Sequence, residues 1–352
     1  MLRFNLERKK VEEKEKKCFI IDYSFYIYNG SFACKTPCRS SKKIDGKIKC
    51  DCAECEGTGW MFMNANGVRT GGLYHVLNAI IPKLKDGYEV ITVFDPPKAN
   101  LLRTKLLDDY KGNRAETPEW ITYQMKLGVD LFPKTKAIQC YMADDEESDD
   151  VMACIAMAKA REGYEVILAS DDKDMFPCLA HKNIKLFRQK ELFTRADFAP
   201  YMKKKYGINF DNPDRFSEFL AIIGDSADNY NIIKGLGPKA AEFFLNKYDH
   251  INELWDDWDE IEDKYKKKLV GSCPGTTCNK CTHNPGKDKP CPARGTDLVY
   301  LKDELDLSLQ LAYLNWEAVY HVVKQPTDIE IVKSELERLR LTVALNNLEL
   351  LF

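Results

Sequence analysis

The sequence lacks any long apolar run. Hydrophobic residues make up 44% of the 352 residues and charged residues 30%, but no stretch approaches the roughly 20 apolar residues of a membrane-spanning helix. Residues 1–17 mix Arg, Lys and Glu with few apolar positions, so they also lack the apolar centre of a secretory signal. We therefore expect a globular, cytoplasmic protein without a membrane partner.

An excess of positive charge is missing too. The formal net charge is only -3, whereas proteins that bind nucleic-acid phosphates usually carry an excess of Lys and Arg. However, nine carboxylates stand in the motifs described below. If bound cations neutralise these nine, the rest of the chain carries a net charge of +6. Such a remainder can bind phosphate.

Disulfide bonds are not expected, although the chain has 13 cysteines. A cytoplasmic compartment keeps thiols reduced, so clustered cysteines there favour metal binding. Nine of the 13 fall into two clusters. The other four stand singly in apolar surroundings, where we expect small buried side chains: Cys18, Cys140, Cys154 and Cys178.

What the sequence does contain is a recurring strand pattern. Short apolar runs at residues 17–22, 89–95 and 164–170 each end at or beside an acid, and helical patterns at 72–84 and 151–162 lie between them. The alternation of strand and helix predicts an α/β fold with a central, mostly parallel sheet. In such sheets ligands bind at the carboxyl ends of the strands, which is where these acids fall.

Nine acidic residues stand at the ends of these predicted strands or next to predicted helices. A single acid can cap a helix or close a turn, and acids before a helix are favoured by its dipole. Many crowded carboxylates repel one another, however, and normally hold divalent cations. Two Mg²⁺ or Mn²⁺ ions could hydrolyse a phosphodiester with oxygen ligands only, without a catalytic His or Cys. The nine residues are Asp22, Asp95, Glu147, Asp149, Asp150, Asp172, Asp174, Asp225 and Asp228.

Two further segments point to a phosphate-bearing ligand. Residues 97–136 show no strand pattern and are rich in Arg, Lys and aromatic residues; we expect this segment to be helical and mobile, with a solvated helix face as the alternative. Gly235 and Gly237 stand in a Gly-Leu-Gly-Pro turn. These glycines let the backbone approach a phosphate, and the helix beginning near Pro238 directs its free N–H groups at it.

The order of these motifs resembles that of the 5′ nuclease family, which includes flap endonucleases, bacteriophage 5′ exonucleases and the 5′ nuclease domains of bacterial DNA polymerase I. The resemblance covers roughly residues 18–250. It rests on Ile20-Ile-Asp22, Val93-Phe-Asp95, Tyr110-Lys-Gly-Asn-Arg114, Glu147-Ser-Asp-Asp150, Ser170-Asp-Asp-Lys-Asp174, Gly224-Asp-Ser-Ala-Asp228 and Lys234-Gly-Leu-Gly-Pro-Lys239.

The resemblance implies a PIN-like 5′ nuclease fold with a helical arch and a helix-three-turn-helix module. It also implies two sites for Mg²⁺ or Mn²⁺, the first held by Asp22, Asp95, Glu147, Asp149 and Asp150, and the second completed by Asp172, Asp174, Asp225 and Asp228. The expected parts of the chain are a charged extension (1–17), an α/β core (18–210) with a cysteine-rich insertion (34–59) and the arch (about 97–136), and a helical region (211–352) with a second cysteine-rich insertion (273–291).

Basic residues of the arch would act on the substrate. Lys111 and Arg114 match residues of the arch through which the family passes a single-stranded 5′ end. Lys111 would support the scissile phosphate electrostatically, with help from Arg103. The implied DNA contacts are Tyr110, Gly235, Gly237 and Lys239, with K⁺ as a further candidate ion at the glycine hairpin.

The two cysteine clusters depart from the family pattern. In the first, Cys52-Ala-Glu-Cys55 precedes two glycines and looks like a zinc knuckle; we expect Cys34, Cys38, Cys52 and Cys55 to bind Zn²⁺, with Cys50 as a spare. The second cluster is also expected to bind zinc; its spacing also matches that of an iron–sulfur cluster, which is the first alternative, and free thiols are the second. Its members are Cys273, Cys278, Cys281 and Cys291. Each insertion is either a structural staple or a DNA-contacting finger.

These observations predict a metal-dependent, structure-specific 5′–3′ exonuclease or flap endonuclease. We expect it to be a free-standing monomer that acts on branched, flapped or 5′-ended DNA and on RNA primers paired with DNA, in replication and repair beside other replication proteins. The stretch from Tyr110 to Arg114 resembles phage members and suggests a viral source, with the host cytoplasm as location. The alternatives are a DNA-structure-binding relative without catalysis, a PIN-type ribonuclease and a zinc-module adaptor.

Overall fold

The computed structural model describes residues 15–44, 46–50, 52–55, 58–97, 101–230, 233, 235–272 and 298–352. The second cysteine cluster (273–291), Lys234 and most of the charged extension lie outside the described residues. In the described part of the chain, no helix is long and apolar enough to cross a membrane.

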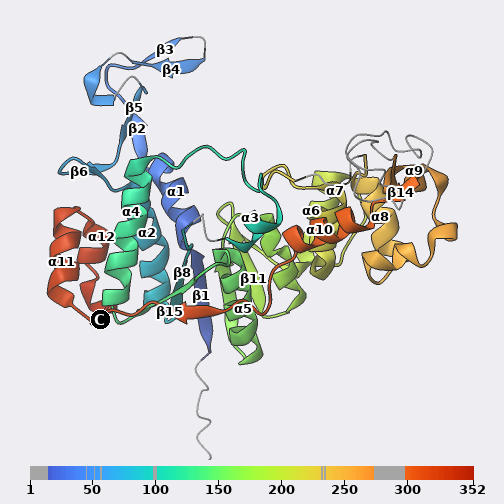
Figure 1. Ribbon diagram of the computed structural model, residues 1–352. Helices are drawn as coiled ribbons and strands as arrows, with labels where there is room; N and C mark the ends of the chain where they lie inside the picture. Colours follow the sequence, from blue (N-terminus) through green and yellow to red (C-terminus); the bar gives the residue numbers. More distant parts are fainter. Residues whose placement is uncertain are drawn as a thin grey trace, which may run out of the picture.

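A seven-stranded sheet forms the centre of the molecule, in the order β12-β11-β10-β1-β8-β9-β15 (Figure 1). The five inner strands are parallel, and the edge strands β12 and β15 are antiparallel to their neighbours. The three predicted strands are confirmed as β1, β8 and β10. The strands are β1 (Lys17–Asp22), β8 (Glu89–Phe94), β9 (Ile138–Ala143), β10 (Glu165–Ala169), β11 (Ile184–Arg188), β12 (Glu191–Phe193) and β15 (Tyr320–Val322).

Helices cover both faces of the sheet, because side chains of the inner strands alternate between two apolar cores. Phe19 and Ile21 of β1 belong to one core, and Cys18 and Ile20 to the other. The first core is closed by α1 (Tyr23–Ala33), α2 (Gly71–Lys85), α4 (Glu119–Leu131), α11 (Ile329–Arg338) and α12 (Thr342–Leu345). The second is closed by α5 (Ser148–Arg161) and the 3₁₀ segment η4 (Lys173–Ala180).

A helical module extends the second core away from the sheet, on the side opposite α11 and α12 (Figure 1). It places the glycine hairpin at one end of the molecule. Its elements are α6 (Arg195–Tyr206), α7 (Phe216–Ile223), α8 (Pro238–Lys247), α9 (Asp263–Leu269), the pair β13 (Val270–Ser272) and β14 (Leu298–Tyr300), and α10 (Lys302–Ala312).

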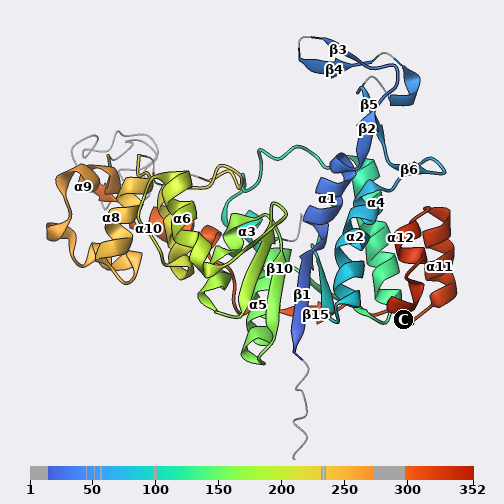
Figure 2. The same ribbon diagram turned by 180° about the vertical axis from the view of Figure 1, so that it is seen from behind.

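The segment predicted as an arch contains the short helix α3 (Leu102–Leu106), a turn-rich stretch, and α4. The first cysteine-rich insertion separates α1 from α2 and stands off from the body of the protein (Figures 1 and 2). It contains β2 (Lys35–Pro37), β3 (Lys42–Ile44), β4 (Lys47–Lys49) and the 3₁₀ turn η1 (Ala53–Cys55). The strands β5 (Trp60–Phe62), β6 (Asn64–Ala65) and β7 (Val68–Arg69) follow it and precede α2.

The region after residue 211 differs from the all-helical expectation. Tyr320, His321 and Val322 form the edge strand β15 on β9, and α11 and α12 then pack in the first core beside α2. The chain therefore returns to the nuclease core after the helical module. A three-residue edge strand is too short to leave an alternating pattern in the sequence, which explains why it was missed.

Candidate metal centre and nucleic-acid interface

Two predicted ligands lie at the carboxyl ends of adjacent parallel strands. Asp22 ends β1 and caps α1 by accepting a hydrogen bond from the backbone N–H of Phe25 at 3.0 Å. Asp95 follows β8, and its Oδ1 accepts from the backbone N–H of Ser148 at 3.0 Å. Burial, and then the neighbouring carboxylate of Asp95, raise the pKa of Asp22 to about 7. Asp22 is therefore a helix cap that also belongs to a crowded acidic group.

Asp149, in the first turn of α5, is the least satisfied of the predicted ligands. Its Oδ1 is buried and has no hydrogen-bond partner among the described residues. Burial, and then the carboxylates of Asp172 and Asp22, raise the pKa of Asp149 well above its usual range. A buried polar atom without a partner is costly, and more so when it is charged. This oxygen therefore fits a cation ligand.

Three further acids form a second group where η4 meets the turn after α7. Carboxylate oxygens of Asp174, Asp225 and Asp228 all lie within 4.8 Å of one another. Asp172 stands between the two groups, because it accepts a hydrogen bond from the backbone N–H of Asp174 at 2.9 Å and its charge also acts on Asp22 and Asp149. The structure thus brings six of the nine predicted acids together beside Asp95.

Lys173 is a functional candidate that the sequence reasoning missed. Its Nζ forms ion pairs with Asp225 and, at 3.3 Å, with Asp174. A lysine thus occupies the position where a cation would bridge these two carboxylates. The Asp-Lys-Asp order at residues 172–174 was available in the sequence, but the long-range partner Asp225 was not.

Asp150 occupies a different position from the other acids. Arg103 holds both of its carboxylate oxygens, at 2.7 and 2.8 Å, and the backbone N–H of Asn315 donates a further hydrogen bond at 2.8 Å. Asp150 is completely buried. The oxygens of Asp150 already have partners in this structure, so metal binding by Asp150 would require Arg103 to move; its role as a ligand stays a prediction.

Arg103 likewise differs from its predicted role beside the scissile phosphate. It is buried, and its guanidinium also donates to Glu147 and to the backbone carbonyl of Tyr313, each at 2.7 Å. Arg103 therefore joins α3, α5 and the segment after α10. It is a positioning residue that fixes the start of α5, where Glu147 and Asp149 stand.

The basic residues predicted for the arch do lie at the acidic site. Lys111 pairs with Glu147 and lies 3.7 Å from Asp228 Oδ2, and Arg114 Nη2 lies 2.6 Å from Asp228 Oδ1. Burial alone would raise the pKa of Glu147, but the charges of Lys111 and Arg103 outweigh it and lower the pKa of that carboxyl. Hence Glu147 and Asp228 have cationic partners within the chain, whereas Asp149 has none among the described residues.

Tyr110 does not offer a surface to DNA in this arrangement. Its side chain is buried, and its hydroxyl donates to Asp228 at 2.8 Å and approaches Glu147 at 3.1 Å. The prediction of a direct DNA contact by Tyr110 is therefore corrected to a bridging role between two acids. The sequence could not reveal this, because Glu147 and Asp228 are distant in the chain.

The acidic groups open into a cleft of about 900 Å³, which Asp22, Asp172, Asp225 and Asp228 line. Three basic residues that the sequence reasoning did not single out stand on its wall, namely Arg188 of β11 and Lys204 and Lys205 of α6. Such a wall can hold phosphate groups next to the carboxylates. The Lys-Lys-Lys run at residues 203–205 was a signal for it.

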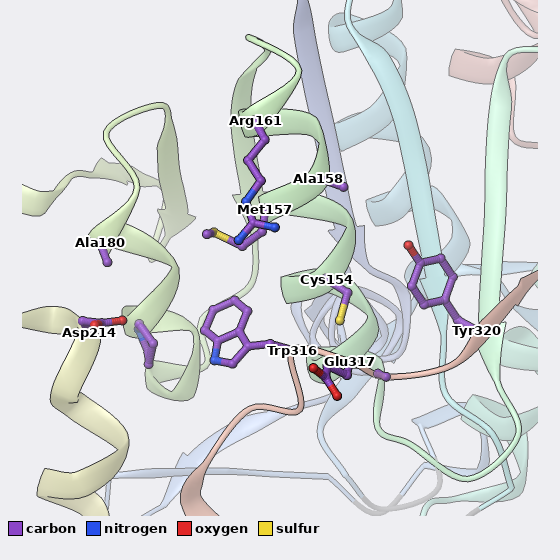
Figure 3. Close-up of a pocket in the computed structure, with 11 residues that line it drawn as sticks. Cys154, Met157, Ala158, Arg161, Ala180, Asp214, Trp316, Glu317 and Tyr320 are labelled. Atoms are coloured by element: carbon purple, nitrogen blue, oxygen red, sulfur yellow. The ribbon is translucent and has the colours of Figure 1, made fainter. Parts of the chain in front are cut away.

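A second cavity, of about 540 Å³, lies on the outer side of α5 (Figure 3). Its lining includes Cys154 and Met157 from α5 and Trp316 and Tyr320 from the segment after α10. None of the nine predicted acids lines it. This cavity is separate from the candidate metal centre.

The glycine hairpin has the geometry expected of a phosphate contact. Gly235 adopts a positive φ of 89°, which favours glycine. A side chain at Gly237, the residue before α8, would meet nothing within 4 Å among the described residues, so the start of α8 is open. Lys239 in the first turn is exposed and pairs with Glu242 at 2.7 Å. The DNA-binding role of these residues stays a prediction.

Four cysteines of the first insertion converge as a metal site would require. The Sγ atoms of Cys38, Cys50, Cys52 and Cys55 all lie within 4.8 Å of one another. The Cys52 Sγ is 3.3 Å from that of Cys38 and 3.3 Å from that of Cys55. A backbone hydrogen bond from Cys55, followed by the neighbouring thiols, lowers the pKa of Cys52 to about 7. Four close sulfurs match a tetrahedral zinc site.

Cys50, not Cys34, completes this set. Cys34 ends α1, where its backbone N–H donates to Gly30, and its Cβ lies close to Gly71 of α2. The structure therefore brings together a different set from the predicted one, which included Cys34 and left Cys50 spare. The reason is that α1 extends to Ala33 and holds Cys34 at the root of the insertion, away from the other thiols.

Protein-family comparisons match both parts of the chain. The N-terminal resolvase-like domain of the 5′-3′ exonucleases matches residues 17–207, and their C-terminal SAM fold matches residues 211–280. The first match alone covers more than half of the chain. The chain belongs to the 5′-3′ exonuclease family. The resemblance read from the motifs is confirmed, and with it membership of an enzyme family of metal-dependent nucleases.

Individual relatives agree with this assignment. The 5′-3′ exonuclease of Buchnera aphidicola is 28% identical over 202 residues, which cover 56% of this chain and 68% of that protein. Flap endonuclease Xni of Cronobacter sakazakii is 27% identical over 196 residues, or 55% and 75% of the two chains. The match to DNA polymerase I of Thermus thermophilus spans only 24% of that protein.

Among solved structures, the bacteriophage T5 D15 protein crystallised with metal ions superposes with a TM-score of 0.56. The match covers 96% of this chain and all of that chain, at 16% identity. This likeness shows a shared fold. The predicted 5′ nuclease fold with a mostly parallel sheet is thereby confirmed.

Asp149 and Asp150 are adjacent but have different surroundings, so substitutions at these two positions should affect stability differently. Arg103→Ala and Asp150→Asn each break a buried ion pair, so each should lower the free energy of unfolding by about 3–5 kcal/mol. Burial and the neighbouring acids raise the pKa of Asp149 well above its usual range, and Asp149→Asn breaks no ion pair among the described residues, so in a chelator it should leave the free energy of unfolding unchanged or raised. Urea unfolding of the three variants in EDTA measures this difference, and equal destabilisation by Asp149→Asn and Asp150→Asn would contradict the assignment.

The acidic groups also predict how stability depends on pH without divalent ions. Because the pKa of Asp22 is raised to about 7 in the folded protein, the folded state holds a proton that the unfolded state has lost. The resulting stabilisation, at most about 1.4 kcal/mol per pH unit for one group, is lost as the pH rises toward and through 7.

Thermal unfolding between pH 5.5 and 8 in EDTA and in Mn²⁺ tests this prediction. The melting temperature in EDTA should fall across this range, and Mn²⁺ should raise it more at pH 8 than at pH 5.5, because protons compete with metal for the same oxygens. An Mn²⁺ effect of equal size at both pH values would argue against ligation by these carboxylates.

Proposed function

We propose that this protein is a structure-specific 5′ nuclease that hydrolyses phosphodiesters at the 5′ ends and flaps of DNA, including RNA primers paired with DNA. The observation that carries the proposal is the crowding of carboxylates at the ends of β1 and β8, the start of α5, η4 and the turn after α7. They lie beside a cleft with a basic wall, which Asp22, Asp172, Asp225 and Asp228 line. The names of the relatives, a 5′-3′ exonuclease and a flap endonuclease, support the same activity.

Divalent cations fit the donor set, since all candidate ligands are carboxylate oxygens and the buried Asp149 Oδ1 has no hydrogen-bond partner among the residues that the structure describes. We assign one site to Asp22, Asp95, Asp149 and Asp172 and a second to Asp174, Asp225 and Asp228. When bound, two such ions supply a water of lowered pKa and neutralise charge on the phosphate. Mg²⁺ is the proposed ion, with Mn²⁺ as a substitute.

The residues of the chain then orient and hold the substrate. Lys111 and Arg114 both lie beside Asp228, so a cation bound by Asp228 would take that carboxylate from both of them and leave their charge available to the phosphate. Arg188, Lys204 and Lys205 hold the backbone of the strand along the cleft wall. The open start of α8 after Gly237 holds duplex phosphates at a distance from the cut. Phosphate contacts of this kind position DNA without reading its sequence.

Cleavage of a 5′-flapped duplex labelled at its 5′ end tests the proposal. The wild-type protein should release short labelled products in Mg²⁺ and none in EDTA, whereas a single-stranded circle without a 5′ end should stay intact. Tight binding of the flap without cleavage in Mg²⁺ or Mn²⁺ would instead indicate a non-catalytic DNA-structure-binding protein. Cleavage of free RNA in preference to flapped DNA would indicate a ribonuclease.

Two substitutions separate the proposed roles. Asp149→Asn should abolish cleavage while flap binding in EDTA stays near that of the wild type, because a metal ligand is lost and the fold is kept. Lys111→Ala should slow single-turnover cleavage by about 10²–10³-fold, as the loss of one charge-stabilising group commonly does. Lys333→Ala, an exposed lysine of α11, is the matched control. A wild-type single-turnover rate in either site variant would remove that residue from the mechanism.

A further inference from the structure

The first cysteine-rich insertion forms a projecting arm, which we call the zinc arm and define as residues Lys35 to Phe62. Its stalk is the antiparallel pair β2–β5, and its tip is the hairpin β3–β4. Figures 1 and 2 show it standing off from the body beyond α1 and α4. Its apolar cluster in the described residues consists of cysteines and Met61. The four thiols therefore take the place of a hydrophobic core, as in other small metal-folded modules.

The root of the arm is fixed to the nuclease core. Phe62 of β5 lies 5.6 Å from the ring of Trp120 in α4, and Trp120 in turn lies 5.5 Å from Phe32 of α1. The guanidinium of Arg69 stacks on Trp120 at 4.5 Å. An arm anchored by these aromatic contacts keeps its direction relative to α4, the helix that follows the basic arch segment.

The arm carries strong positive charge. Residues 35–49 contain six Lys and Arg residues and one Asp. Arg39, Lys42, Lys43 and Lys49 are exposed, and none of the four forms an ion pair with another residue in the part of the chain that the structure describes. Four exposed cations that have no carboxylate partner among the described residues favour an anionic partner, and their spread along a hairpin suits a row of phosphates.

The position of the arm matches a path for nucleic acid. The arm follows α1, and Asp22 at the carboxyl end of β1 caps that helix. The arm therefore lies on the side of the sheet where the parallel strands end, which is also the side of the acidic residues (Figure 1). The module with α8 lies at the other end of the molecule. The candidate metal centre stands between these two elements. A nucleic acid that crosses the centre can therefore contact the glycine hairpin on one side and the arm on the other.

We propose that the zinc arm is a second nucleic-acid-binding element, organised by Zn²⁺ on Cys38, Cys50, Cys52 and Cys55, whose exposed bases hold the phosphate backbone of the substrate on the side opposite the glycine hairpin. This inference rests on the proposed nuclease function. The arm would then bind substrate and not only stabilise the fold. It also extends the contact surface well beyond the cleft.

Zinc content tests the metal part. Because the second cysteine cluster can hold metal of its own, the informative quantity is the difference between variants. Cys50→Ser should contain one zinc ion fewer per chain than the wild type, whereas the matched variant Cys34→Ser should contain the same number. Retention of zinc in Cys50→Ser, or its loss in Cys34→Ser, would overturn the ligand set.

The salt dependence of binding tests the nucleic-acid part. Fluorescence anisotropy with a labelled 5′-flapped duplex, without added Mg²⁺ and without a chelator so that zinc is retained, gives between 50 and 200 mM salt the slope of log K against log salt concentration. Lys42→Ala/Lys43→Ala should weaken binding and make the slope shallower by about 1.4–1.8, since each phosphate contact contributes roughly 0.7–0.9. Lys85→Ala/Lys182→Ala is the control, because both lysines are exposed and precede the amino ends of β8 and β11.

The outcomes separate this inference from the proposed function. If the wild-type protein cleaves flaps but the arm variant keeps the wild-type affinity and slope, the arm does not bind nucleic acid and the nuclease proposal stands. If the arm variant loses affinity while the wild-type protein fails to cleave in Mg²⁺, the arm is a binding element and the catalytic proposal fails. An equal loss in the control variant would mean that charge at any surface position matters, which overturns the assignment to the arm.

Discussion

The repulsion among carboxylates at one edge of the sheet is the constraint on which the rest of this structure depends. The parallel order of β1, β8 and β10 brings Asp22, Asp95 and Asp172 to the same edge, and the start of α5 adds Asp149. Burial makes this crowding worse, because it removes the water that would screen the charges. Arg103, Lys111, Arg114 and Lys173 supply positive charge to this edge.

The chain meets this constraint in two distinct ways. Where a carboxylate has a permanent partner, as Asp150 has in Arg103, the pair ties α3 to α5 and stabilises the fold. Where the partner is a long side chain on a turn, as with Lys111 at Glu147, the pairing can be exchanged for another cation. Among the described residues, Asp149 forms no ion pair, and its Oδ1 has no hydrogen-bond partner. Asp150, with a fixed partner, therefore builds the site. Glu147, whose partner can be exchanged, and Asp149, which has none among the described residues, are the acids that can interact with metal or substrate.

The sequence predicted the parts of this site that depend on local pattern. The strand ends fixed the edge at which Asp22 and Asp95 lie, and the motif order identified the family. It did not predict the partners of Asp150 or Tyr110, because those contacts join α3, α5 and the turn after α7 across more than 30 residues of chain. Cys34 was chosen over Cys50 for a similar reason: spacing alone cannot show that α1 continues to Ala33 and withholds Cys34 from the other thiols.

The central claim is that divalent ions bind at two positions on this edge and that Asp150 holds neither. Anomalous diffraction from crystals containing Mn²⁺ tests it most directly. Two peaks are expected, one beside Asp149 and one among Asp174, Asp225 and Asp228, with the Arg103–Asp150 pair intact and free of metal. A peak on Asp150 with Arg103 displaced, or no peak among the carboxylates at saturating Mn²⁺, would contradict it.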